Sequence, residues 1–248
     1  MVDVKMPLTA HLEELRWRLI KSLAAIAAGF IGCYNFAEEL FAFLTRPLVH
    51  LNPGPVTLIG TGVVEAFFTK LKVSLIAAVF LASPVILYQA WAFVAPGLYS
   101  QEKRYARPFV IFGTLFFVLG GAFCYELVFP VGFAFFLEEY KTIGVQPSIR
   151  ISEYLSLSAR MLLAFGVTFE LPVITFFFAR LGLVTHRTMI HYSRYAIVVI
   201  FIVAAVLTPG PDVASQLLMA GPLLLLYAIS IAVAYGFAKP RESVTSDQ

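Results

Sequence analysis

Residues 161–179 read MLLAFGVTFELPVITFFFA, nineteen consecutive positions with a single charged side chain, Glu170, at their centre. A helix rises about 1.5 Å per residue, so this stretch is about as long as the ~30 Å hydrocarbon core of a bilayer is thick. It therefore predicts a membrane-spanning helix with a carboxylate near mid-membrane. Because a charge at that depth is costly, a protein keeps one for a function or pairs it with a polar neighbour for packing alone. Both interpretations of Glu170 stay open, and the stretch favours function.

The composition extends this prediction to a protein that crosses the membrane several times. Of the 248 residues, 60% are hydrophobic and 13% are charged, and the mean hydropathy is +0.85. A soluble domain does not need so much apolar surface. The first eighteen residues carry six charges and no apolar run, so we expect an uncleaved first helix as the insertion signal. Cys33 and Cys124 fall in apolar segments and are expected to be small core residues.

Six apolar segments are expected to be transmembrane helices, at about residues 19–37, 73–92, 108–129, 157–179, 195–207 and 215–237. The fifth has thirteen residues, about 20 Å of helix, and Pro and Gly at 209–211 end it. Segments five and six therefore predict a short hairpin in an all-α, six-helix membrane protein. We expect residues 1–238 to form one domain, with an amphipathic helix at 8–20, and residues 239–248 to form a flexible tail.

The basic residues predict the orientation of these segments. Twelve of the eighteen Lys and Arg residues lie in the N-terminus, the loops after segments two and four, and the tail. Positive residues favour the cytoplasm, so both termini are expected to be cytoplasmic. The long connections, residues 38–72 and 138–156, are then on the outer side and are expected to cap that face.

Two carboxylates are expected near the cytoplasmic surface. Leu at positions 8, 12, 15 and 19 forms an apolar stripe, and Glu14 lies on the polar side of the same helix. An ordinary i, i+4 ion pair between Glu14 and Arg18 is the alternative. Glu102 follows a Pro-Gly helix break and would lie in the first turn of a new helix, where plain solvation is the alternative. Because Arg is the best geometric match to a carboxylate, the two together suit cationic groups of a partner.

The remaining polar residues give weaker signals. Asp212 precedes the sixth segment, where Asp commonly caps a helix, and Glu126 is expected to be solvated at an interface. His186 and His191 are five positions apart, a poor spacing for metal ligands, and are expected at the surface. The sequence has no Gly-x-Ser-x-Gly, His-Glu-x-x-His or Gly-rich phosphate loop. It therefore predicts no enzyme and no cofactor or metal.

Five stretches, in order along the chain, are similar to a known family. They lie at residues 11–19 (HLEELRWRL), 82–93, 96–104, 164–172 and 208–227. In them the chain resembles TatC, the receptor subunit of the twin-arginine protein translocase. The resemblance extends from about residue 7 to about residue 238, and the order of the motifs together with six spans makes it specific.

By this resemblance the protein is a signal-peptide receptor and assembly platform in the bacterial inner membrane. It implies a concave, glove-like fold and export of folded proteins driven by the proton-motive force. Glu14 and Glu102 would pair with the two arginines of a signal peptide, and Arg16 and Phe93 would belong to the same surface. This agrees with the partner that the two surface carboxylates suit.

The resemblance also implies a second site, inside the membrane. Glu170 would face the concave interior and meet a polar residue of the single-span partners TatA and TatB. The fifth helix and the turn after it would add Val203, Leu207, Thr208 and Asp212. Gly210 in the turn and Ala228, where many members carry an acidic residue, depart from the family pattern. Glu170 would then carry more of the polar site.

An ion or small-solute transporter with Glu170 as its proton site is the competing class. Such folds usually show internal repeats and paired broken helices. Pro84, Pro172 and Pro222 are single prolines with no matching halves. The sequence therefore favours a receptor over a transporter.

Overall fold

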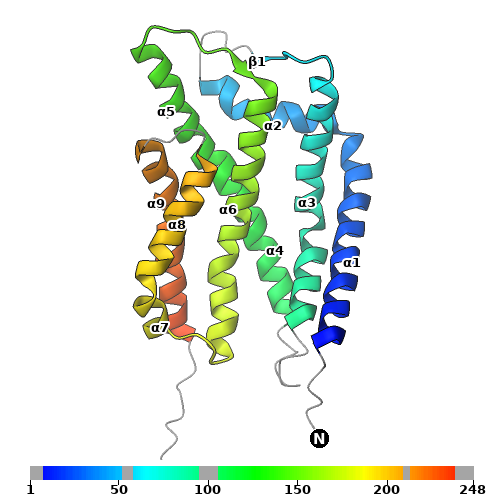
Figure 1. Cartoon of the computed structure of the whole chain (residues 1–248), viewed down its shortest axis with the longest axis vertical. Coiled ribbons are helices and arrows are strands. Elements are labelled where there is room, and N and C mark those ends of the chain that lie inside the picture. Colours follow the sequence, from blue (N-terminus) through cyan, green and yellow to red (C-terminus); the bar gives the residue numbers. More distant parts are fainter. Residues whose placement is uncertain (1–7, 52–57, 95–105, 209–212, 238–248) are drawn as a thin grey trace, which may run out of the picture.

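The computed structural model describes residues 8–51, 58–94, 106–208 and 213–237. Within them nearly all the chain is helical, and most helices run roughly along the long axis in Figure 1. One end carries a crossing helix and two short strands, and we refer to it as the cap end. At the opposite end, the terminal end, α1 begins and α9 finishes. Glu102, Asp212 and the predicted tail lie outside the described residues.

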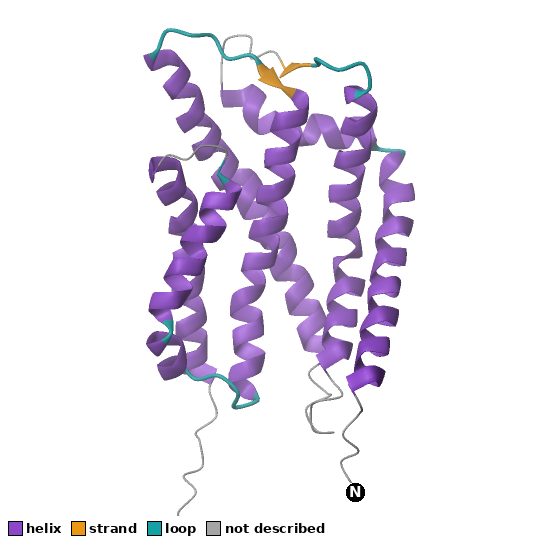
Figure 2. Cartoon of the chain, in the orientation of Figure 1, coloured by secondary structure: helices purple, strands orange, loops and turns teal. Residues whose placement is uncertain are grey.

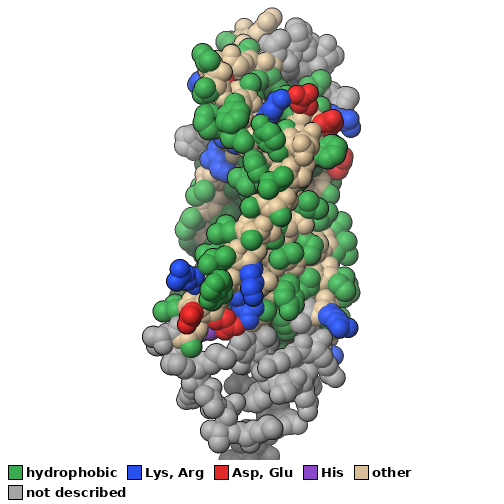
Figure 3. Space-filling view, turned by 90° about the vertical axis from the view of Figure 1, so that its right-hand side faces the viewer, with side chains coloured by type: hydrophobic (Ala, Val, Ile, Leu, Met, Phe, Trp, Pro, Cys, Tyr) green, Lys and Arg blue, Asp and Glu red, His purple; other side chains and the backbone are tan. Residues whose placement is uncertain are grey.

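The six predicted apolar segments each coincide with helical structure. The helices between the two ends are α1 (Leu8–Tyr34), α3 (Glu65–Val94), α4 (Ala106–Phe123) with its continuation α5 (Phe129–Thr142), α6 (Ile151–Arg180), α8 (Ser193–Leu207) and α9 (Val213–Phe237). Four of these runs, α3, α4 with α5, α6 and α9, are long and apolar enough to cross a membrane. α1 meets the same criteria only when it is taken together with the next helix, residues 37–49. Charged side chains in Figure 3 gather towards the two ends, with a mostly hydrophobic band between. The chain is a multi-pass helical membrane protein.

Several helices are longer than predicted. The amphipathic stretch at 8–20 and the first apolar segment form one continuous helix, α1, because no proline separates them. The third segment runs on to Thr142 through a π-helix at Cys124–Val128. Pro130 stands in the first turn of α5, directly after the π-helix, where the backbone hydrogen-bonding pattern changes.

The last two helices differ in length. α8 has 15 residues, about 22 Å, and is short as predicted. α9, expected to be short as well, has 25 residues, about 37 Å, and is long enough to span the bilayer. A short helix, α7 (His186–His191), precedes α8, and the Thr185 hydroxyl caps it by accepting from the Thr188 N–H.

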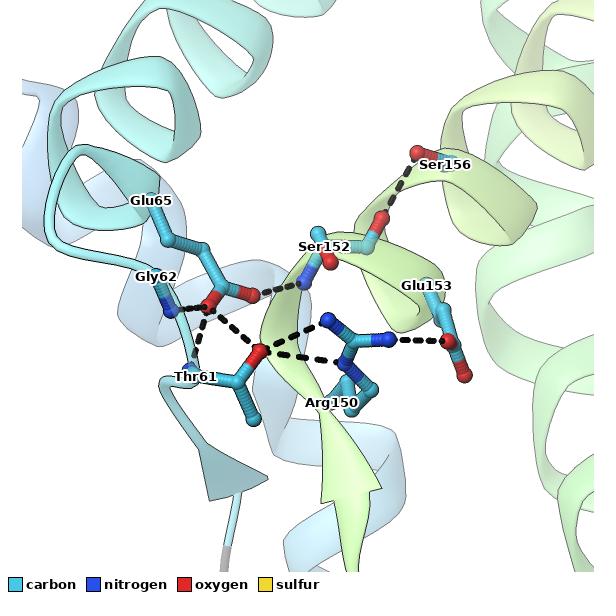
Figure 4. Close-up of polar contacts among 7 residues, drawn as sticks. All are labelled: Thr61, Gly62, Glu65, Arg150, Ser152, Glu153 and Ser156. Carbon is cyan, nitrogen blue, oxygen red and sulfur yellow. Dashed lines mark hydrogen bonds and ion pairs between the residues drawn. The ribbon is translucent and has the colours of Figure 1, made fainter.

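The cap is built by the two long connections, as predicted, and they pair with each other (Figure 2). α2 (Ala37–Leu51) bends by 88° from α1 and crosses that end. Strand β1 (Leu58–Ile59) pairs in parallel with β2 (Ile149–Arg150). Glu65 then joins the two connections by accepting from the backbone N–H groups of Thr61, Gly62 and Ser152, at 2.6, 3.0 and 2.9 Å (Figure 4). This clasp ties the start of α3 to the start of α6.

The largest buried cluster joins α2, α5, α6 and α9 towards the cap end. Its fully buried side chains include Leu48, Phe129, Leu155, Phe165 and Leu223. A smaller cluster of Trp91, Phe109, Val173 and Phe177 joins α3, α4 and α6. Cys124 is fully buried and Cys33 half-buried, and both are free, as predicted.

The packing of α4 on α6 depends on a glycine. A Cβ at Gly120 would lie 2.5 Å from the Phe165 carbonyl oxygen and 2.9 Å from the Phe169 side chain. Real carbon atoms do not approach a backbone so closely, so Gly120 sets the distance between the two helices. That distance determines where Glu170, five residues beyond Phe165 on α6, meets α4.

Candidate functional site

Glu14 is the centre of a polar cluster near the terminal end of α1 and α3. Arg18 donates from Nε to Glu14 Oε1 at 3.0 Å, and its Nη2 contacts the same oxygen. Nη1 of Arg18 also donates to Gln89 Oε1 of α3 at 3.5 Å. The i, i+4 pair that the sequence left open therefore forms, and α1 and α3 share its guanidinium.

One half of the Glu14 carboxylate is left without a hydrogen bond. Glu14 Oε2 is buried and accepts none from any described group. Nδ1 of His11 lies 3.8 Å from it, beyond hydrogen-bond distance. The His11 ring stacks on Phe93 of α3, with centroids 4.2 Å apart and planes 15° from parallel. The structure thus brings Glu14 and Phe93, both predicted site residues, to one place through His11.

The other predicted residues of this surface lie differently. Arg16 is exposed and makes no ion pair with a described residue. Two positions from Glu14, it points to another side of α1, because residues i and i+2 do not share a helix face. Sequence reasoning did not single out Gln89. The signal that could have found it is its spacing, one helical turn before Phe93 on the same face of α3.

Glu170 lies inside the helix bundle. Its side chain is 5% exposed, and neither carboxylate oxygen has a hydrogen-bond partner among the described residues. It stands nineteen residues from the start of α6 and ten from its end. On α4, a Cβ at Gly113 would lie 3.1 Å from Glu170 Oε2, so the glycine leaves room for the carboxylate. The alternative that Glu170 is paired with a polar neighbour for packing alone finds no support among the described residues.

Three of the other predicted intramembrane residues lie at the end of α8 or directly after it. Leu207 and Thr208 are buried, and the Thr208 hydroxyl donates to the Ala204 carbonyl at 3.1 Å, while Val203 is 36% exposed. α8 packs against α9, to which it is also joined by Gln216 Nε2 donating to the Phe201 carbonyl at 3.0 Å. Glu170 faces Gly113 of α4 instead. Glu170 and the predicted residues of α8 thus have different described neighbours.

The spanning helices, the ion-pair cluster at one end and the unpaired carboxylate within the bundle define a multi-pass membrane protein with polar sites at two depths. Residues 10–222 match the family model described as TatC, Sec-independent protein translocase protein. The chain belongs to the TatC family, as its motifs predicted.

Relatives and solved structures agree with this assignment. The Sec-independent protein translocase protein TatC of Desulforapulum autotrophicum is 48% identical over 242 residues, 97% of this chain and 88% of the relative. TatC of Helicobacter pylori strain J99 is 44% identical over 230 residues, 92% of this chain and 88% of the relative. The crystal structure of the twin-arginine translocase receptor TatC superposes with a TM-score of 0.81 at 38% identity, over 90% of this chain and 97% of that one. These matches confirm the predicted fold class.

Proposed function

We propose that this protein is the signal-peptide receptor of a twin-arginine translocase, and that Glu14 and Glu102 bind the two arginines of the peptide. Membership of the TatC family supports the receptor role. The observation that carries the residue assignment is Glu14 itself. One of its oxygens already binds a guanidinium, and the other is buried without a hydrogen bond. A carboxylate in that state accepts a further charge-assisted hydrogen bond.

The surroundings of Glu14 suit an arginine side chain. A guanidinium is planar and stacks on aromatic rings, and the paired rings of His11 and Phe93 lie beside the carboxylate. Lysine lacks the planar fork, so a peptide with two lysines would lose both the paired hydrogen bonds and the stacking. The site would therefore distinguish arginine from lysine by geometry, because both side chains carry the same charge.

Glu170 and α8 are proposed to receive the single-span partners TatA and TatB. An unpaired carboxylate inside a membrane protein is costly, and a polar group on an incoming helix would satisfy it. Val203 of α8 is exposed enough to contact such a helix, whereas Leu207 and Thr208 support it from inside. Transport would draw on the proton-motive force through the assembled complex, with no chemistry by this chain.

The protein is proposed to lie in the bacterial inner membrane with both termini in the cytoplasm. The described chain begins and finishes at the same end (Figure 1). Arg180, at the close of α6, and Arg194, at the start of α8, lie at that end too. Basic residues favour the cytoplasmic side. A signal peptide made in the cytoplasm would then meet Glu14 directly.

Photocrosslinking of a twin-arginine signal peptide to this protein in membranes tests the proposal. Glu14→Gln and Glu102→Gln should each reduce the crosslink about tenfold, since each removes a charge-assisted hydrogen bond worth at least ~1.5 kcal/mol. Glu13→Gln is the matched control, because Glu13 is exposed next to Glu14 and makes no ion pair with a described residue. If Glu14→Gln and Glu102→Gln crosslink the peptide as strongly as the control Glu13→Gln, at equal protein levels, the assignment of the two carboxylates is refuted.

A further inference from the structure

Two basic side chains from different spanning helices meet at one serine near the cap end. Lys72 Nζ of α3 donates to Ser156 Oγ of α6 at 3.0 Å. Arg160, one turn further along α6, donates from Nε to the Ser156 carbonyl at 3.1 Å. Since both bonds end on atoms of Ser156, the ammonium and the guanidinium flank the same residue. Both side chains are exposed at the surface.

These two cations lack the counter-charge that their neighbours have. Neither Lys72 nor Arg160 forms an ion pair with a carboxylate of the described chain. Three other basic residues at the cap end each have one: Lys70 with Glu38, Lys141 with Glu138 and Arg150 with Glu153. Two adjacent unpaired cations repel each other, so their juxtaposition is stabilised when an anion lies between them.

The depth of the pair identifies the kind of anion. α3 and α6 each have 30 residues, about 45 Å, and exceed the ~30 Å hydrocarbon core by about 15 Å. With both helices centred, the hydrocarbon begins about five residues inside each one, near residues 70 and 156. Arg160 starts below this boundary, and its side chain reaches back to Ser156 on it, as long basic side chains do in membranes. The charged groups therefore lie at the level of lipid phosphates.

The apolar surface below the pair suits acyl chains. Leu75, three positions after Lys72, is 49% exposed, and Val167, seven positions after Arg160, is 63% exposed. Helical spacing places each on the same face as its cation and deeper in the membrane. A phospholipid with its phosphate at the cations would lay its chains along these residues.

We propose that Lys72 and Arg160 bind the phosphate group of a phospholipid from the leaflet at the cap end. Lys72 keeps two further N–H donors and Arg160 keeps its terminal fork, which matches a phosphate in a bidentate way. Ser156 holds the two side chains in place, and its own hydroxyl donates to the Ser152 carbonyl at 2.6 Å. This site is independent of the signal-peptide site at the other end of the molecule.

Native mass spectrometry of the delipidated protein, titrated with phosphatidylglycerol, tests the proposal. The double variant Lys72→Gln/Arg160→Gln should bind the lipid about tenfold more weakly than the wild type, the loss expected for charge-assisted hydrogen bonds. The matched control is Lys70→Gln/Lys141→Gln, which removes two cap-end cations that already have carboxylate partners. It should bind as the wild type does. Equal affinity of the wild type and the first double variant would overturn the site.

Two further titrations test whether the site needs a phosphate group and whether that phosphate must belong to a lipid. Diacylglycerol with the same acyl chains lacks the phosphate and should bind equally weakly to both double variants and the wild type. Inorganic phosphate that displaced the lipid at equal concentration would show a free anion as ligand and overturn the lipid assignment. The exchange variant Lys72→Arg/Arg160→Lys keeps both charges and should retain the lipid. If the Gln double variant fails to fold, loss of binding in the folded exchange variant would overturn the proposal instead.

Discussion

Replacing Arg18 by Gln should strengthen the binding of a twin-arginine peptide. Arg18 occupies one oxygen of Glu14 through two of its nitrogens and is held on its other side by Gln89. A peptide arginine that is to use both carboxylate oxygens must displace this internal guanidinium. Arg18→Gln removes the competitor and leaves Glu14 in place.

The size of the effect follows from the exposure of the pair. The side chains of Arg18 and Glu14 are 22% and 21% exposed, so the pair is neither a surface ion pair nor a fully buried one. Exposed i, i+4 pairs contribute about 0.3–0.5 kcal/mol, and hydrogen bonds to charged groups at most ~3 kcal/mol. We take about 0.5–1 kcal/mol for this pair, because water reaches part of both side chains. Its removal should raise the peptide affinity about two- to fivefold.

Fluorescence anisotropy of a labelled peptide with the protein in lipid nanodiscs measures this change. Lys21→Gln is the matched control, since it removes one positive charge from the same helix about one turn away and is exposed. The affinity of Lys21→Gln shows how much of any increase in peptide affinity comes only from weaker repulsion of a basic peptide. A fall in affinity for Arg18→Gln, with Lys21→Gln unchanged, would refute the competition and show that Arg18 orients Glu14 for binding.

Three other changes test different parts of the structure. Gly120→Ala should destabilise the protein by about 1–3 kcal/mol, because its Cβ would lie 2.5 Å from the Phe165 carbonyl oxygen. Thermal unfolding in detergent should show a lower midpoint for this variant. The control Gly32→Ala has open space around it and should not lower the midpoint. Glu170→Gln should leave peptide crosslinking at the wild-type level but reduce co-purification of single-span partners, and a loss of folded protein instead would assign Glu170 to stability. Glu65→Gln should weaken acceptance from three backbone N–H groups, so hydrogen exchange at Ser152 should quicken; unchanged exchange would mean that the strand pairing alone holds the cap.

Hydropathy was enough to predict the helical framework, because the bilayer requires each apolar run of sufficient length to be a helix. It located the end of a segment to within a few residues where Pro and Gly follow, as after Leu207. It did not locate the start of α3, which lies eight residues earlier than predicted. The first turns of α3 project beyond the hydrocarbon and carry Glu65, Lys70 and Lys72. Hydropathy falls at these polar residues although the helix does not end there.

The parts that depend on contacts between distant segments were harder to predict. The sequence indicated a cap, but the pairing of β1 with β2 joins residues about ninety positions apart through only two residues of each strand. In the polar cluster around Glu14, Glu14 and Phe93 were singled out separately, and the stacking of His11 on Phe93 depends on the angle between α1 and α3. The burial of Glu170 depends on Gly113 of another helix, for which a lone glycine in an apolar run gives no signal.

The clasp at Glu65 has a mechanical consequence. It fastens α3 to α6 at one extremity only, through hydrogen bonds that lie far from Glu170 along α6. A small rotation of α6 about this clasp would displace the far part of the helix most. A guest helix that enters beside Glu170 and separates α3 from α6 would have to part the ring contact of Trp91 with Phe177, while the hydrogen bonds of the clasp stay intact.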